Sequence, residues 1–161
     1  MNTAELMNDH FHFEVSEGKN QCQINLFGVI DENTDLSSFL KYKGQKLVFN
    51  FKEITSINSC GIRTWVNLMK ELGSSPIEFM ECPPLVVRQM NMVPSFLGSA
   101  KVVSVYVPYV CDSCEHEDNQ LVKIDDYKSG TPVAESLTCK NCSSEEMEID
   151  GNVKQYFAFV K

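Results

Sequence analysis

The sequence predicts an α/β fold in which helices pack on a mixed sheet, followed by a small β-rich extension. Between residues 11 and 107, apolar extended runs alternate with amphipathic segments in the order β-β-α-β-α-β-α-β. The first two extended runs are separated only by a short polar turn at 17–20, which is typical of a hairpin and makes the sheet mixed. From Pro108 onward the chain is acidic and contains paired cysteines, without a helical period. We therefore expect a core domain over residues 1–107 and an extension over 108–161.

Composition and charge indicate that the chain forms a packed core and argue against some classes of partner. The chain has 161 residues, of which 43% are hydrophobic and ten are Phe, enough for a packed core. Its net charge of −8 argues against nucleic acids or anionic membranes as partners. No apolar run approaches the roughly 20 residues of a membrane helix, and the N-terminus lacks the features of a signal peptide. We expect a cytoplasmic protein without membrane insertion.

The first part of the chain predicts a hairpin and a short helix. Runs 11–16 and 21–30 alternate in hydropathy, as half-buried strands do. The polar stretch 31–35 then offers several N-caps for a short helix through residues 36–40, and Gly44 closes it.

The middle of the chain predicts two strand–helix units and a further strand. Run 46–51 is rich in Val and Phe and suits a strand, while residues 62–72 repeat apolar side chains at three- and four-residue steps. A strand over 77–82 leads to a helix that Pro83-Pro84 opens and Pro94 ends. The β-branched run 101–110 predicts another strand. In the extension we expect strands over 120–124 and 156–160.

A small polar turn, Ile57-Asn58-Ser59-Cys60-Gly61, joins the strand at 46–51 to the helix at 62–72. We call it the Ser59 knuckle. Ser59 falls at the start of the helix, where free N–H groups and the helix dipole favour an anion such as a phosphate on Ser59. The alternative is that Ser59 only caps the helix, since Ser is among the commonest N-caps.

Four of the seven cysteines form two C-x-x-C pairs, separated by 24 residues. Each pair can present two thiolates to one metal, so Cys111, Cys114, Cys139 and Cys142 predict a structural Zn²⁺ site resembling a zinc ribbon. Redox-active pairs, or iron in place of zinc, are the alternatives. The other cysteines, Cys22, Cys60 and Cys82, are expected to be buried, and the three histidines to be surface or packing residues.

Three motifs of residues 11–107 resemble the STAS family, named for sulfate transporters and anti-sigma factor antagonists. Gly28-Val29-Ile30-Asp31 with Thr34 is similar to the family's G-x-x-D before its first helix. Residues 47–51 leading into the Ser59 knuckle are similar to its hydrophobic strand and D-S-S-G-L sequence, and residues 86–92 to its last helix region. Asn58 and Cys60 depart from the usual knuckle, in which Asp and Ser or Ala are common.

The resemblance implies a non-enzymatic regulator. In anti-sigma factor antagonists, an anti-sigma kinase phosphorylates the first Ser of the knuckle, and the unphosphorylated form binds the kinase and frees a sigma factor for transcription. Carried over by position, the phosphoacceptor is Ser59 and an acidic residue near the knuckle is Asp31. We expect the partner surface to comprise Asp31, Asn58, Ser59, Arg63 and Asn67, with Lys70 an ordinary solvated residue.

Two other functions stay open at this point. The same surface could dock, without phosphorylation, on the ATPase of a membrane transporter, or the C-x-x-C pairs could sense redox state or metal. No phosphate-binding Gly loop, paired-carboxylate site or positioned nucleophile predicts catalysis, so we expect neither enzymatic activity nor a small-molecule substrate.

Overall fold

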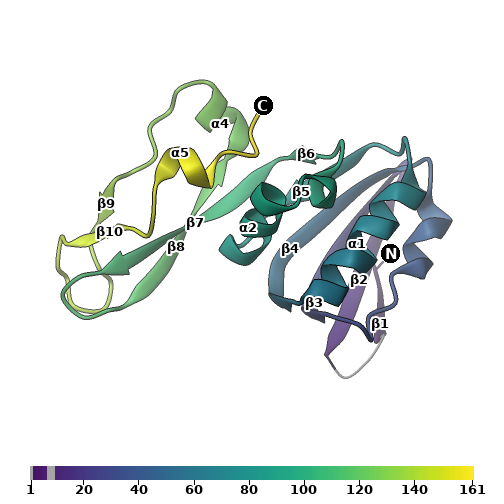
Figure 1. Cartoon of the computed structure of the whole chain (residues 1–161), viewed down its shortest axis with the longest axis horizontal. Helices are drawn as coiled ribbons and strands as arrows, with labels where there is room; N and C mark the ends of the chain where they lie inside the picture. The colour runs from purple at the N-terminus through teal and green to yellow at the C-terminus, as the bar shows by residue number, and fades with distance from the viewer. Residues whose placement is uncertain (1, 7–9) are drawn as a thin grey trace.

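The structure, a computed structural model, describes residues 2–6 and 10–161 and contains two sheets with helices packed against them (Figure 1). The first sheet has the strand order β1-β2-β3-β4-β5-β6 and the second the order β8-β7-β10-β9. The strands of the first sheet are β1 (Asn2–Leu6), β2 (Phe11–Gly18), β3 (Gln21–Ile30), β4 (Lys46–Ile57), β5 (Ile77–Met80) and β6 (Lys101–Val102). Those of the second are β7 (Ser104–Cys111), β8 (Glu117–Lys123), β9 (Ser136–Leu137) and β10 (Met147–Ile149). The helices are the 3₁₀ helix η1 (Ser37–Tyr42), and α1 (Ser59–Leu72), α2 (Pro84–Met92), α3 (Pro94–Leu97), α4 (Ile124–Lys128) and α5 (Val153–Tyr156). The expected mixed α/β class is confirmed.

The first sheet changes from antiparallel to parallel pairing along its width. Strands β1, β2 and β3 pair antiparallel, and the hairpin predicted from the two alternating runs is confirmed. Strands β3, β4, β5 and β6 pair parallel, because a helical segment returns the chain after β3, β4 and β5. The carboxyl end of β4 is therefore the place where the chain enters α1.

One face of the first sheet carries the core. Strands alternate buried and half-buried residues, as the hydropathy pattern requires. Trp65 of α1 packs edge-on between Phe49 and Phe51 of β4, with ring centroids 5.0 and 5.2 Å apart, and its indole N–H donates to the Phe96 carbonyl oxygen at 3.0 Å. Phe39 of η1 contacts Phe49 on the same face. His12 lies on the opposite face, where its ring stacks on Phe27 with centroids 4.5 Å apart.

The expected strand over 101–110 is wrong as a single element. Its first residues form β6 in the first sheet, while β7 belongs to the second sheet. Val103 lies between them, donating its N–H to Phe79 and accepting from the N–H of Ile124. Cys82 bridges to Val105, so the two sheets meet at the start of β7. The expected boundary at residues 107 and 108 falls inside β7.

The other differences are local. The expected strand over 156–160 is wrong: α5 and a turn occupy this stretch, with the Asn152 side chain capping α5 by accepting from the Gln155 N–H at 3.1 Å. The helix expected through residues 36–40 is the 3₁₀ helix η1. Pro94 follows the end of α2 as expected but also opens the short α3. Among the described helices, none is long and apolar enough to cross a membrane.

Candidate functional site

Four cysteines that are far apart in the sequence gather at one end of the second sheet. The sulfur atoms of Cys111, Cys114, Cys139 and Cys142 all lie within 4.8 Å of one another. Two contacts cross between the pairs, Cys111 to Cys142 and Cys114 to Cys139, each with a sulfur–sulfur distance of 3.6 Å. All four are free thiols. The expected convergence of the two C-x-x-C pairs is confirmed.

The two pairs are built as equivalent turns. In the first, the N–H of Glu115 donates to the Cys111 carbonyl oxygen, and in the second the N–H of Ser143 donates to that of Cys139, both at 2.9 Å. Glu115 and Ser143 each adopt a φ of 64°, in the left-handed region. Each turn directs its two thiols to the same point.

The sulfur spacing fits a single tetrahedral ion. Four thiolates about 2.3 Å from a metal lie about 3.8 Å from one another in a tetrahedron, close to the 3.6 Å of the two crossing contacts. Cys111 and Cys139 are buried, Cys114 is half-buried and Cys142 is exposed. The cluster can therefore hold a metal ion at the rim of the sheet, and its donor set does not identify which ion.

The pKa values of two thiols in the cluster, Cys114 and Cys142, are shifted in opposite directions. The Asn141 side chain, which reaches Cys114 Sγ at 3.4 Å, and the His116 backbone N–H lower the pKa of Cys114 to about 6. The Ser144 N–H favours the thiolate of Cys142, but the hydrogen bond between Cys142 and the neighbouring Cys114 sulfur favours the protonated form, and the pKa of Cys142 is raised to about 12. A metal ion binds thiolates, so binding of a cation by the cluster releases protons from the thiols.

The Ser59 knuckle lies where β4 ends and α1 begins. Asn58 is the N-cap: its Oδ1 accepts from the Gly61 N–H at 2.8 Å, and its carbonyl oxygen accepts from the Ile62 N–H at 2.9 Å. Ser59 is the first residue of α1 and is exposed. The alternative that Ser59 caps the helix is therefore wrong, because Asn58 fills that role.

Gly61 allows α1 to start directly against the end of β3. A Cβ at this position would lie 2.1 Å from the Ile30 carbonyl oxygen. The same oxygen accepts a hydrogen bond from the Asn58 N–H at 3.2 Å. Only glycine permits this approach.

The acidic residues next to the knuckle have different roles. Asp31 is buried, and its Oδ1 accepts from the Asn33 N–H at 2.9 Å and the Thr34 hydroxyl at 3.3 Å. Its carboxylate therefore shapes the loop after β3. Glu32 is exposed and accepts from the Asn58 side-chain amide at 2.7 Å. Sequence reasoning missed Glu32, since nothing in the local pattern marks a contact across 26 residues.

The exposed surface of α1 aligns three of the expected partner residues. Ser59, Arg63 and Asn67 follow one another at four-residue steps and are all exposed. We call this row the α1 stripe. Cys60, next to Ser59, is also exposed, so the expectation that it is buried is wrong; Cys22 and Cys82 are buried as expected. Burial raises the pKa of the Cys82 thiol well above its usual range.

Comparison with protein-family models and with curated proteins finds no match for this chain.

Proposed function

We propose that the protein is a non-enzymatic regulator of the STAS type, which binds a protein partner through the Ser59 knuckle and the α1 stripe. The observation that carries the proposal is the position of Ser59: it is exposed at the start of α1, and Asn58 does the capping in its place. Its hydroxyl is free for modification or for a partner. The partner class that the sequence resemblance suggests is an anti-sigma kinase or a related regulator.

The charges around Ser59 support a phosphorylation switch. The first N–H groups of a helix have no acceptor within the helix, and the helix dipole favours negative charge there. Arg63 stands one turn further along the same face. A phosphate on Ser59 would add about two negative charges to a surface that already holds Glu32 against Asn58. An acidic partner surface would then be repelled.

We further propose that the four-cysteine cluster holds a structural Zn²⁺. A set of four thiolates closes the coordination sphere and leaves no position for a substrate. Two strands of the second sheet, β9 and β10, have only two and three residues, so binding of the ion would add to the stability of this sheet. Free thiols that serve as metal ligands also suit the reducing cytoplasm.

The decisive experiment is capture of partners from native cells with tagged protein, followed by mass analysis of Ser59. Ser59→Ala should retain the captured kinase-like partner, and Ser59→Glu should lose it by about tenfold or more, because a charge enters the interface. Ser74→Glu is the matched control, since Ser74 is exposed in the turn after α1.

Three results would contradict the proposal. A Ser59→Glu protein that binds the partner as tightly as wild type excludes a charge-sensitive interface at Ser59. Capture of a transporter ATPase with unmodified Ser59 identifies the docking function without a switch. Activity that follows oxidation or loss of zinc would instead assign the function to the cysteines.

A further inference from the structure

The outer strand of the second sheet, β8, has an open edge. The strand order is β8-β7-β10-β9, so β7 pairs with β8 on one side, and among the described residues no strand pairs with it on the other side (Figure 1). β8 has seven residues, whereas the other edge strands β1, β6 and β9 have five, two and two. Proteins usually keep edge strands short or cover them, because an open row of N–H and C=O groups can pair with another strand. The long edge of β8 is therefore a candidate interaction surface.

The ladder between β7 and β8 determines which backbone groups of β8 face the open edge. The Ile124 N–H donates to the Val103 carbonyl oxygen, and the Cys111 N–H donates to the His116 carbonyl oxygen, both at 2.9 Å. These two bonds flank β8 at even positions and continue its regular register with β7. Hydrogen-bonded pairs alternate along an antiparallel ladder, so the even residues of β8 bond to β7. The backbone groups of the odd residues face the open edge: Glu117, Asn119, Leu121 and Lys123.

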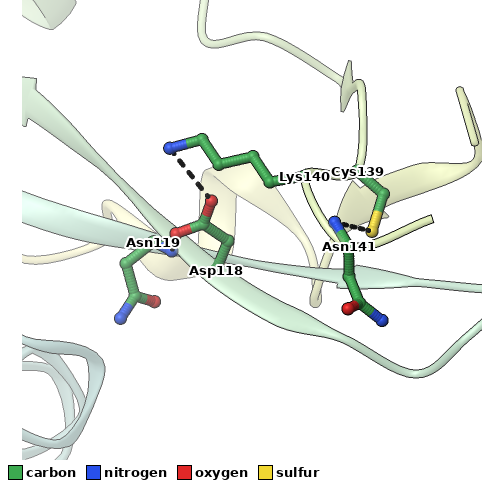
Figure 2. Close-up of polar contacts among 5 residues, drawn as sticks. All are labelled: Asp118, Asn119, Cys139, Lys140 and Asn141. Carbon is green, nitrogen blue, oxygen red and sulfur yellow. Dashed lines mark hydrogen bonds and ion pairs between the residues drawn. The ribbon is translucent and has the colours of Figure 1, made fainter. Parts of the chain in front are cut away.

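A contact of Asn119 supports this assignment. Its N–H donates to Asp118 Oδ1 at 2.8 Å, which is the side chain of the preceding residue and not a group of β7. The other carboxylate oxygen of Asp118 lies 3.7 Å from the Lys140 ammonium (Figure 2). A side chain therefore occupies an edge position that a second strand could take. A strand that pairs with this edge has to displace the contact, which makes its association weaker.

The sequence of β8 is complementary to itself. An antiparallel second copy of β8 can pair all four edge-facing residues in only one register, which is centred on Gln120. In that register Glu117 lies opposite Lys123 of the second copy, and two-fold symmetry repeats the pair. Both residues are exposed, and within the described ranges 2–6 and 10–161 neither takes part in an ion pair. Opposite charges that face each other across neighbouring strands stabilise the pairing.

The same register covers an exposed apolar side chain. Leu121 is 47% exposed and is one of two exposed large hydrophobic side chains in the described part of the chain. It lies on the same face of β8 as Glu117 and Lys123, because side chains alternate along a strand. On that face the Leu121 side chains of the two copies become diagonal neighbours, which can contact one another. The pairing therefore removes apolar surface from water.

From the open edge, the register and the charges we propose that two copies of the chain associate through β8, antiparallel and centred on Gln120. Their four-stranded sheets then join into one. The interface contains the seven residues of β8 from each copy, far fewer than the roughly 20–30 residues a side of a standard interface, so the dissociation constant should lie between about 10 µM and 1 mM. The surface excludes Ser59, and the proposal does not depend on the proposed function.

Sedimentation velocity of the full chain, at micromolar to millimolar concentrations, measures this association under reducing conditions that prevent disulfides between exposed cysteines. Glu117→Lys and Lys123→Glu each place like charges opposite one another and should weaken the homodimer by about 2- to 30-fold. An equimolar mixture of the two variants should recover wild-type association, because each lysine then faces a glutamate of the other copy. Glu135→Lys, at an exposed position outside β8, is the matched control. General repulsion between acidic chains predicts the opposite result for Glu117→Lys, which makes the chain less negative.

Leu121→Pro tests the backbone pairing, because it removes an N–H that faces the edge and keeps the ladder to β7. It should reduce association below detection, and circular dichroism checks that the variant is folded. Ser59→Glu should leave association unchanged, which separates this surface from the Ser59 knuckle. A wild-type chain that stays monomeric at millimolar concentration would overturn the proposal. A mixture of the charge variants that associates no more tightly than either variant alone would also overturn it and assign any dimer to a different surface.

Discussion

Replacement of Gly61 by alanine tests the geometry of the Ser59 knuckle most directly. In an ordinary helix this change is favourable, since alanine is better than glycine by up to about 1 kcal/mol. Here the new methyl group would lie 2.1 Å from the Ile30 carbonyl oxygen, whereas ordinary contacts begin at 3.4 Å. The start of α1 and the end of β3 must therefore move apart by about 1.3 Å.

Two effects determine how much Gly61→Ala changes the free energy of unfolding. Overpacking of a well-packed contact costs about 1–3 kcal/mol. The same displacement strains the hydrogen bond from the Asn58 N–H to the Ile30 oxygen, which contributes about 1 kcal/mol. Together they exceed the gain in helix propensity, and we expect Gly61→Ala to lower the free energy of unfolding by about 2 kcal/mol.

Urea unfolding followed by tryptophan fluorescence measures this change. Trp65 is the single tryptophan and lies buried in α1 against the first sheet, so its emission reports on the relevant contact. Asn67→Ala, an exposed change in the same helix, is the control and should be neutral or slightly stabilising. A Gly61→Ala protein as stable as wild type, or more stable, would refute the close approach of α1 and β3.

Three further predictions concern the knuckle, the cysteine cluster and the joined sheets. Asn58→Asp keeps the cap but places a second carboxylate against Glu32; it should lower stability by up to about 1 kcal/mol at pH 7, and Glu32→Gln should restore it in urea unfolding. Cys139→Ser removes a buried thiol of the four-cysteine cluster; if the cluster holds zinc as proposed, the change should lower bound zinc from about one per chain toward zero in metal analysis, whereas Cys60→Ser should retain the ion. Burial raises the pKa of Tyr156 well above its ordinary value of 10.0, so its contribution to stability is complete below pH 10 and declines as the pH rises toward the folded-state pKa. Between pH 8 and pH 11, under reducing conditions, Tyr156→Phe should therefore lose less stability than wild type; an equal loss would contradict this assignment.

The sheet and the cysteine cluster were predictable because their signals are local and regular. The alternation of the two runs that form β2 and β3 fixes both the strands and their buried face. Each C-x-x-C pair contains its own turn, so spacing alone indicates that two thiols converge. The prediction used only the spacing within each pair, and it did not require knowledge of where in the fold the two pairs meet.

The details of the knuckle could not be predicted in the same way. Asn58 and Ser59 are both good N-caps, and only the end of β4 at Ile57 decides between them. The contacts of Glu32 and Ile30 with this turn join segments separated by a whole helix and strand.

The strand predicted over residues 156–160 was wrong for a different reason. Phe157 and Phe159 are both buried at a two-residue spacing, which imitates a strand. In the structure a turn buries them: Phe157 stacks on Tyr127 with ring centroids 4.1 Å apart.

The position of β7 determines where an expressed fragment of the chain can end without exposing a strand edge. Its first residues receive support from both sheets: the Ser104 carbonyl oxygen accepts from the Cys82 N–H, and the Tyr106 N–H donates to the Cys82 carbonyl oxygen. A fragment ending at Val107 would keep this half of the strand but remove β8, leaving the backbone groups of β7 that pair with β8 without partners. Such a fragment would present a bare apolar edge able to pair with another copy. Expression fragments that end before Ser104 avoid this hazard, although they leave the Cys82 N–H without its acceptor.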